Sequence, residues 1–214
     1  MTPERLSRLQ RRVLIALWLC CGLPCLTWAG AEEGFAAYQR GDYRTAHRIW
    51  QPLAQRGDVR AQGALGGLYA DGRGVPQDAG EAVKWFRLAA AQGQPKAQFM
   101  LGVLSQQGEG VPQDAAEAAT WFRKAAEQGE AAAQLALGVL YADGRGVAKD
   151  LIQAHVWLNL AAAPLPPGEA RDKAAKARDT VASRMTAAQL ADAQQRARAW
   201  RPTARPATSP SRQE

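Results

Sequence analysis

The stretch from Leu65 to Asp78 reads L-G-G-L-Y-A-D-G-R-G-V-P-Q-D, and near copies of it occupy Leu101–Asp114 and Leu137–Asp150. Each copy begins 36 residues after the one before it. The matching residues continue on both sides, from Ala61-Gln62 before the first copy to Gln92-Gly93 after it. A fixed period of this length is typical of a repeat architecture, because each period then encodes one supersecondary unit.

The first half of each unit has the pattern of an amphipathic helix. Its apolar residues recur at spacings of three and four, which puts them on one helical face. In the first unit these residues are Ala61, Ala64, Leu65, Leu68 and Tyr69. Gly72 and Gly74 follow, and glycines at these places supply the left-handed conformations that end a helix and form a tight loop.

The second half of each unit begins with a helix-capping pattern. Asp78 with Glu81 has the spacing of a capping box, in which the Asp accepts from a free N–H and the Glu reaches back. The expected buried residues of this second helix are Ala82, Trp85, Phe86 and Ala89. Gly66, Gly102 and Gly138 fall inside the first helices, and their recurrence predicts that the paired helix approaches closely there.

A single helix pair cannot bury its own apolar faces, so the units are expected to stack. The predicted fold is all-α, a right-handed α-solenoid of antiparallel helix pairs with a C-terminal helical cap. Sparse Val, Ile and Thr agree with helix over sheet. The predicted repeat domain covers 32–200, with a shorter pair at 32–57, repeats at 58–93, 94–129 and 130–163, and a cap at 169–200. Residues 201–214 have no apolar period and are predicted to be a disordered tail.

The first 31 residues have the composition of a secretory signal peptide. Arg11 and Arg12 precede a short apolar run, and small residues follow at Ala29-Gly30-Ala31. Cleavage is expected after Ala31, with Ala29 as the second choice. The alternative is an uncleaved membrane anchor, which the shortness of the run and Pro24 disfavour. All three cysteines lie in this segment, so the processed chain would contain no thiol or disulfide.

The pattern A-Q-x-x-L-G-x-x-Y, G-x-G-V-x-x-D, A-x-x-W and A-A-x-x-G resembles Sel1-like repeats, relatives of the tetratricopeptide repeat. The resemblance covers roughly 34–163. It implies a Sel1/TPR-like superhelix and, for an exported bacterial member, a scaffold or regulator in an envelope complex. A cysteine-rich branch of the family is associated with penicillin binding or β-lactamase activity. This chain lacks the paired repeat cysteines of that branch.

The resemblance also indicates a binding surface, because the first helix of each tetratricopeptide pair lines a concave groove. Aligned in this way, the first repeat points Gly63 and Gly67 into the groove. An apolar strip where solvent is otherwise expected often marks a binding site, although neighbouring helices or the cap could cover it. The predicted partner-binding residues are Arg60, Lys96, Phe99, Val103, Leu135 and Val139.

Residues that could carry chemistry are few. His47 and His155 are far apart in sequence, without nearby metal-ligand partners, and the S-x-x-K, G-x-S-x-G and H-E-x-x-H motifs do not occur. The surplus of 27 basic over 20 acidic residues is modest and partly due to the N-terminal arginines, so a nucleic-acid partner is not expected.

The sequence therefore predicts a periplasmic or secreted scaffold for a protein or peptide partner in the cell envelope. It is not expected to be an enzyme or to have a cofactor, a metal or catalytic residues. Contact with a membrane is expected only if the N-terminal segment is not cleaved. The alternatives are a hydrolase that acts on peptidoglycan or β-lactams, and a glycan-binding module.

Overall fold

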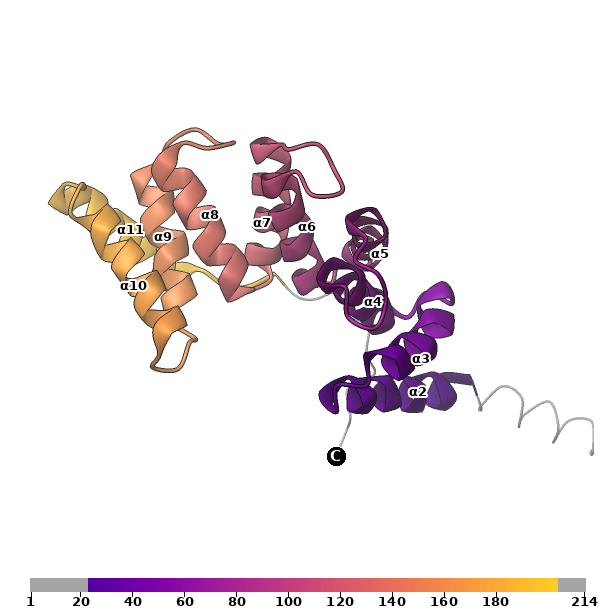
Figure 1. The fold of residues 1–214 in the computed structure, drawn as a ribbon. Helices are drawn as coiled ribbons and strands as arrows, with labels where there is room; N and C mark the ends of the chain where they lie inside the picture. The colour runs from indigo at the N-terminus through magenta and orange to yellow at the C-terminus, as the bar shows by residue number, and fades with distance from the viewer. Residues whose placement is uncertain (1–22, 204–214) are drawn as a thin grey trace, which may run out of the picture.

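The computed structural model describes residues 23–203, and the regular structure within this range is entirely helical. The helices stack in chain order into a curved array, from the indigo end to the yellow end of Figure 1. This arrangement confirms the predicted solenoid of helix pairs. The described helices are α2 (Leu23–Gln39), α3 (Tyr43–Gln55), α4 (Val59–Asp71), α5 (Ala79–Ala91), α6 (Pro95–Gln107), α7 (Ala115–Glu127), α8 (Ala131–Asp143), α9 (Leu151–Ala162), α10 (Glu169–Ala182) and α11 (Ala187–Ala199).

A mid-helix glycine lets the two helices of each repeat pack closely. A Cβ atom built on Gly66 would lie 2.6 Å from the Phe86 ring, and one on Gly102 would lie 2.6 Å from the Phe122 ring. In the third repeat, Gly138 faces Leu158 in the same way, at 2.7 Å. These distances are shorter than a carbon–carbon contact of about 3.5 Å allows. The sequence-based expectation for the three glycines is therefore confirmed.

Buried glutamines join each repeat to the one before it. Gln98 Nε2 donates to the Ala90 carbonyl at the end of the preceding helix, and Gln128 Nε2 donates to Gln98 Oε1 at 2.7 Å. The same bonds recur 36 residues earlier, around Gln62 and Gln92. Buried amides are stable only when they are hydrogen-bonded, so these bonds fix how consecutive repeats dock. The series ends at the third repeat, because Pro164 stands where the next donor would be.

Aspartates cap the second helices as expected. Asp78 accepts from the backbone N–H of Glu81, and Asp114 accepts from those of Ala116 and Glu117. The reciprocal half of the predicted capping box is not found at Glu81, whose carboxylate binds Lys84 instead. Both halves are present at the start of α11, where Thr186 and Gln189 exchange bonds.

The N-terminal pair, α2 and α3, packs around Trp50. This residue is 1% exposed, and its indole N–H donates to the carbonyl of Ala31. Gly34 provides the room, since a Cβ there would overlap the Trp50 ring. Helix α2 begins at Leu23, before the predicted cleavage site, and Ala31 is itself part of the core.

The C-terminal helices α10 and α11 pack on α9 and close that end of the array. After α11 the chain turns back along the solenoid, and Thr203 donates from its N–H and hydroxyl to the Glu127 carbonyl at the end of α7. The first residues of the predicted tail therefore make specific contacts. Residues 204–214 of that tail, and residues 1–22 of the predicted signal peptide, lie outside the described range.

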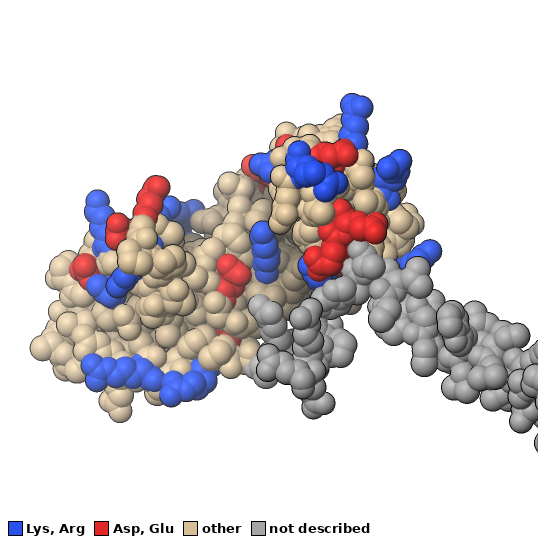
Figure 2. Space-filling model, turned by 90° about the horizontal axis from the view of Figure 1, so that it is seen from below, with Lys and Arg blue, Asp and Glu red and all other residues tan. Residues whose placement is uncertain are grey.

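The surface has mixed charge. Figure 2 shows Lys and Arg side chains interspersed with Asp and Glu, with a row of basic side chains along one edge at the end where α10 and α11 lie. Within residues 23–203, every helix is too short or too polar to cross a bilayer.

Two adjacent glycines of α4 provide a matched test of this packing. Gly66→Ala should destabilise the protein by about 1–3 kcal/mol, because the new methyl group overlaps Phe86. Gly67→Ala should stabilise it by up to about 1 kcal/mol, because the added methyl group meets open space and alanine favours the helix. Urea unfolding of both variants measures the two changes. Equal effects of the two substitutions would contradict the proposed role of Gly66.

Candidate functional site

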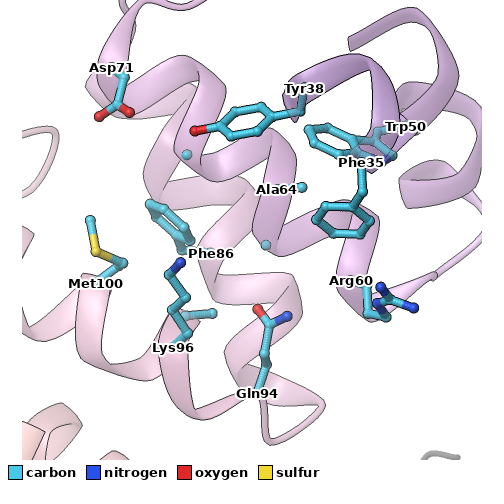
Figure 3. A pocket seen from close by; sticks show the side chains of 13 residues that line it. Phe35, Tyr38, Trp50, Arg60, Ala64, Asp71, Phe86, Gln94, Lys96 and Met100 are labelled. Atoms are coloured by element: carbon cyan, nitrogen blue, oxygen red, sulfur yellow. The ribbon is translucent and has the colours of Figure 1, made fainter. Parts of the chain in front are cut away.

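A pocket of about 450 Å³ opens on the first helices of the N-terminal half, between α2, α4 and α6 (Figure 3). Clefts of this size are typical of sites that hold a ligand or a short piece of a partner. The lining residues are Phe35, Tyr38, Trp50, Arg60, Gly63, Ala64, Gly67, Asp71, Phe86, Gln94, Lys96, Ala97 and Met100.

The floor of the pocket is α4, which presents small residues there. Gly63 and Gly67 lie one helical turn apart, and Ala64 is next to Gly63. Together they form a stripe on α4 that has no large side chains. Gln94 closes the end near Gly63, where its amide donates to the Val59 carbonyl at 3.2 Å. A Cβ on Gly67, by contrast, would have no atom within 4 Å.

Aromatic side chains of α2 form one wall. Phe35 packs on Trp50 with ring centroids 4.8 Å apart, and Tyr38 lies 5.8 Å from the same ring. The Tyr38 hydroxyl accepts a hydrogen bond from Arg73 at 2.9 Å. Because both rings are held by these contacts, the wall is preorganised. Met100 of α6 lies on the opposite side (Figure 3).

The charges of the pocket are separated along its length. Lys96, in the first turn of α6, extends from the end near Gln94 into the pocket, whereas Asp71 lies at the opposite end (Figure 3). The guanidinium of Arg60 stacks over Phe35 at 4.8 Å and pairs with Glu32 at 2.7 Å. Lys96 is exposed and makes no ion pair with the residues that the structure describes. The cationic end therefore lies at the helix N-termini, where the helix dipole adds positive potential.

Only two of the six predicted groove residues line the pocket, and the other four lie outside it. Arg60 and Lys96 line the pocket. Phe99 and Val103 are half-buried and pack toward α7, with the Phe99 ring 5.7 Å from that of Phe122. Leu135 packs against the cluster that includes Val181 of α10, so the cap lies against this part of the strip. Val139 remains 38% exposed.

Sequence reasoning missed Phe35, Tyr38 and Met100. The first two belong to α2, which does not follow the 36-residue register that α3 shares with the second helices of the repeats, so alignment of the repeats could not place them. Met100 occupies the position of Ala64 and Ala136 in the other repeats. A signal was available, since the aromatic spacing Phe35–Tyr38 puts both rings on one helical face.

The histidines and tryptophans outside the pocket have packing roles. His47 hydrogen-bonds the Tyr69 hydroxyl at 3.2 Å, and His155 is buried in α9. Trp85 is a core residue as expected and Trp157 is also buried, whereas Trp121 is only half-buried and donates to Glu117. Across residues 23–203, no group of three or more His, Cys, Asp or Glu side chains is placed to hold a metal ion.

Comparison with known protein families identifies the same three helix pairs as repeats of one family. The Sel1 repeat model matches residues 59–94, 95–130 and 131–163. Residues 59–163 are three Sel1 repeats. Sel1 repeats generally form helical scaffolds for protein–protein interaction, and the family is typically non-catalytic.

Two solved structures are similar to this Sel1-repeat chain. One is a Sel1 repeat protein from Oxalobacter formigenes, with 36% identity over 62% of this chain and 55% of that protein, and a TM-score of 0.60. The other is a protective antigen of uropathogenic Escherichia coli strains with an SLR fold, with 29% identity over 92% of this chain and 49% of that protein, and a TM-score of 0.56. The chain thus spans about half the length of each. No curated protein matches it.

The two histidines, one buried and one half-buried, predict how stability changes with pH. Burial lowers the pKa of His155 below its ordinary value near 6.5, and Arg178 adds to this effect while Asp179 opposes it. Burial alone lowers the pKa of His47. As the pH falls below about 6.5, these histidines become protonated in the unfolded chain before they do so in the folded protein. The free energy of unfolding therefore decreases as the pH falls from about 6.5 through the lower folded-state pKa values.

We expect the thermal midpoint to drop between about pH 7.5 and pH 5, and the drop to be smaller in His155→Gln. Calorimetry at several pH values measures this. His47→Gln is the comparison, because His47 is half-buried and keeps a Tyr69 partner. An unchanged pH dependence in His155→Gln would exclude that histidine as the source.

Proposed function

We propose that this Sel1-repeat protein is an exported scaffold of the bacterial cell envelope that holds a segment of a partner protein in the pocket between α2, α4 and α6. The observation that carries the proposal is the open pocket itself, which has a rigid aromatic wall and a floor of small residues. Solenoids commonly bind extended partners along their concave surfaces. The N-terminal sequence supports export, and the bacterial sources of the two similar structures support a bacterial origin.

The proposal shifts the expected contact surface toward the N-terminal half. Phe99 and Val103 pack toward α7, and Leu135 lies against α10. This part of the predicted strip therefore has less apolar surface available for contact with a partner. The pocket residues of α2 and α4, together with Lys96 and Met100 of α6, are also exposed or half-buried, but they surround an open volume.

Partner capture from crosslinked cells tests this assignment. Tagged wild type should retain a protein that Gly67→Val loses, because the valine fills the pocket floor. Valine is compatible with this helix position, since Val103 and Val139 occupy it in the next two repeats. Val139→Ala changes the same position outside the pocket and should capture normally. Equal capture by all three proteins would place the interface elsewhere, and circular dichroism checks that they are equally folded.

Export makes a second prediction, about the mature N-terminus. Cleavage after Ala31 would remove a buried residue and the carbonyl that accepts from Trp50. Cleavage after Ala29 would retain both, so we favour Ala29 over the Ala31 site.

The mass of the protein purified from the periplasm should therefore correspond to a chain that begins at Gly30. A recombinant chain beginning at Glu32 should be less stable than one beginning at Gly30 by about 1 kcal/mol or more, the value of a lost buried hydrogen bond. A mature protein that begins at Glu32 with undiminished stability would contradict this assignment, and a protein found unprocessed in the cytoplasm would contradict export.

A further inference from the structure

We infer that the pocket is specific for an extended, acidic segment of a partner protein, with a carboxylate of the segment on Lys96 and its backbone against Gly67. This inference rests on the proposed function and adds the chemistry of the ligand. Its three supports are the environment of Lys96, the absence of a packing role for Gly67, and the apolar wall beside them.

Lys96 is placed where a cation is locally unfavourable. Helix α6 has no side-chain cap at Gln94 and no acidic residue in its first turn, so its N-terminus is positive before the lysine is added. Lys84, on the outer helix of the first repeat, is paired with Glu81. Lys96 has no such partner among residues 23–203, and its side chain extends into the pocket (Figure 3). An incoming carboxylate would satisfy both the ammonium and the helix end.

Gly67 lacks the packing reason that explains its neighbour. Gly66 is required because Phe86 occupies the space of its Cβ, but a Cβ on Gly67 would meet nothing. Its φ angle is not positive, so the backbone does not require glycine either. A glycine inside a helix costs about 1 kcal/mol relative to alanine. This cost in helix stability is explained if the absence of a side chain at Gly67 lets the backbone of a ligand approach α4.

The apolar wall completes the specificity. Lys96 and Met100 are one turn apart on α6, a separation of about 6 Å along the helix. Side chains two residues apart in an extended chain are separated by about 6.6 Å and point the same way. A segment with its acid on Lys96 therefore presents the side chain two residues away to Met100, opposite Tyr38 and Phe35. The expected pattern is an acidic residue and an apolar residue separated by one position.

The chain's own C-terminal segment is a poorer match. Thr203 is tethered at the end of α7, and the eleven residues that follow could extend about 36 Å. This segment contains Arg205 and Arg212 and a single acidic residue, Glu214. Its basic side chains would face Lys96, so a separate acidic partner fits the charge of the site better.

Selection from a random octapeptide display library tests the inference with the full-length protein. Wild type should enrich peptides with Asp or Glu two positions from an apolar residue. Lys96→Glu should replace the acidic preference with a basic one and bind the wild-type peptides about tenfold more weakly or worse, because a charge-assisted bond becomes a repulsion. Gly67→Val should lose enrichment, and Val139→Ala should retain it.

Several results would overturn the inference. They are the absence of enrichment with wild type, the same peptides selected by Lys96→Glu, and enrichment that appears only after residues 204–214 are deleted, which would make the tail the occupant. Capture from cells separates these failures from failure of the proposed function. A partner lost by Gly67→Val but retained by Lys96→Glu would leave the scaffold role standing and remove the acidic ligand.

Discussion

The fold depends on the close approach of the two helices in each repeat, which requires a residue without a side chain at one position of the first helix. Phe86 and Phe122 fill the space beside Gly66 and Gly102, and Leu158 does so beside Gly138. The helix is weakened by each glycine, but the buried ring replaces more apolar surface than a methyl group could. Because the same contact recurs every 36 residues, every pair has nearly the same shape and the pairs can stack in one superhelix.

Stacking then depends on a polar contact that only a neighbouring repeat can complete. Gln98 donates a hydrogen bond to the Ala90 carbonyl of the preceding repeat and accepts one from Gln128 of its own repeat. The first bond is buried and the second is half-buried, so a repeat in the wrong register would leave the buried amide of Gln98 without its partners. The third repeat shows the limit of the series. Gln134 still donates to the Ala126 carbonyl, but its Oε1 is buried without a partner among the described residues. Repetition ends there, and α10 and α11 take over the role of closing the core.

The pocket arises where the repetition is imperfect at the other end. Helix α2 does not carry the repeat pattern, and its rings stand beside α4 in place of a regular neighbour. In later repeats, Phe99 and Leu135 occupy the position of Gly63, and Val103 and Val139 that of Gly67. The same surface is thus filled by side chains in the C-terminal half and open in the N-terminal half. Departures from an otherwise regular pattern are the places where a repeat protein can acquire a particular ligand.

The helix pairs, their caps and their order can be derived from the sequence alone, because they follow from local spacing and from glycine and aspartate signals that recur with one period. The sequence also determined that Gly66 must be close to another helix, since nothing local explains a glycine there. Which of the predicted groove residues are exposed depends instead on how the helices pack in three dimensions. Leu135 and Val139 lie one turn apart on α8, yet Leu135 lies against α10 and Val139 is exposed, because the position of the cap depends on contacts between residues far apart in the chain. Likewise, the rings of Phe35 and Tyr38 became part of the site only when α2 packed beside α4, and a 36-residue pattern that starts after α2 has no information on that contact.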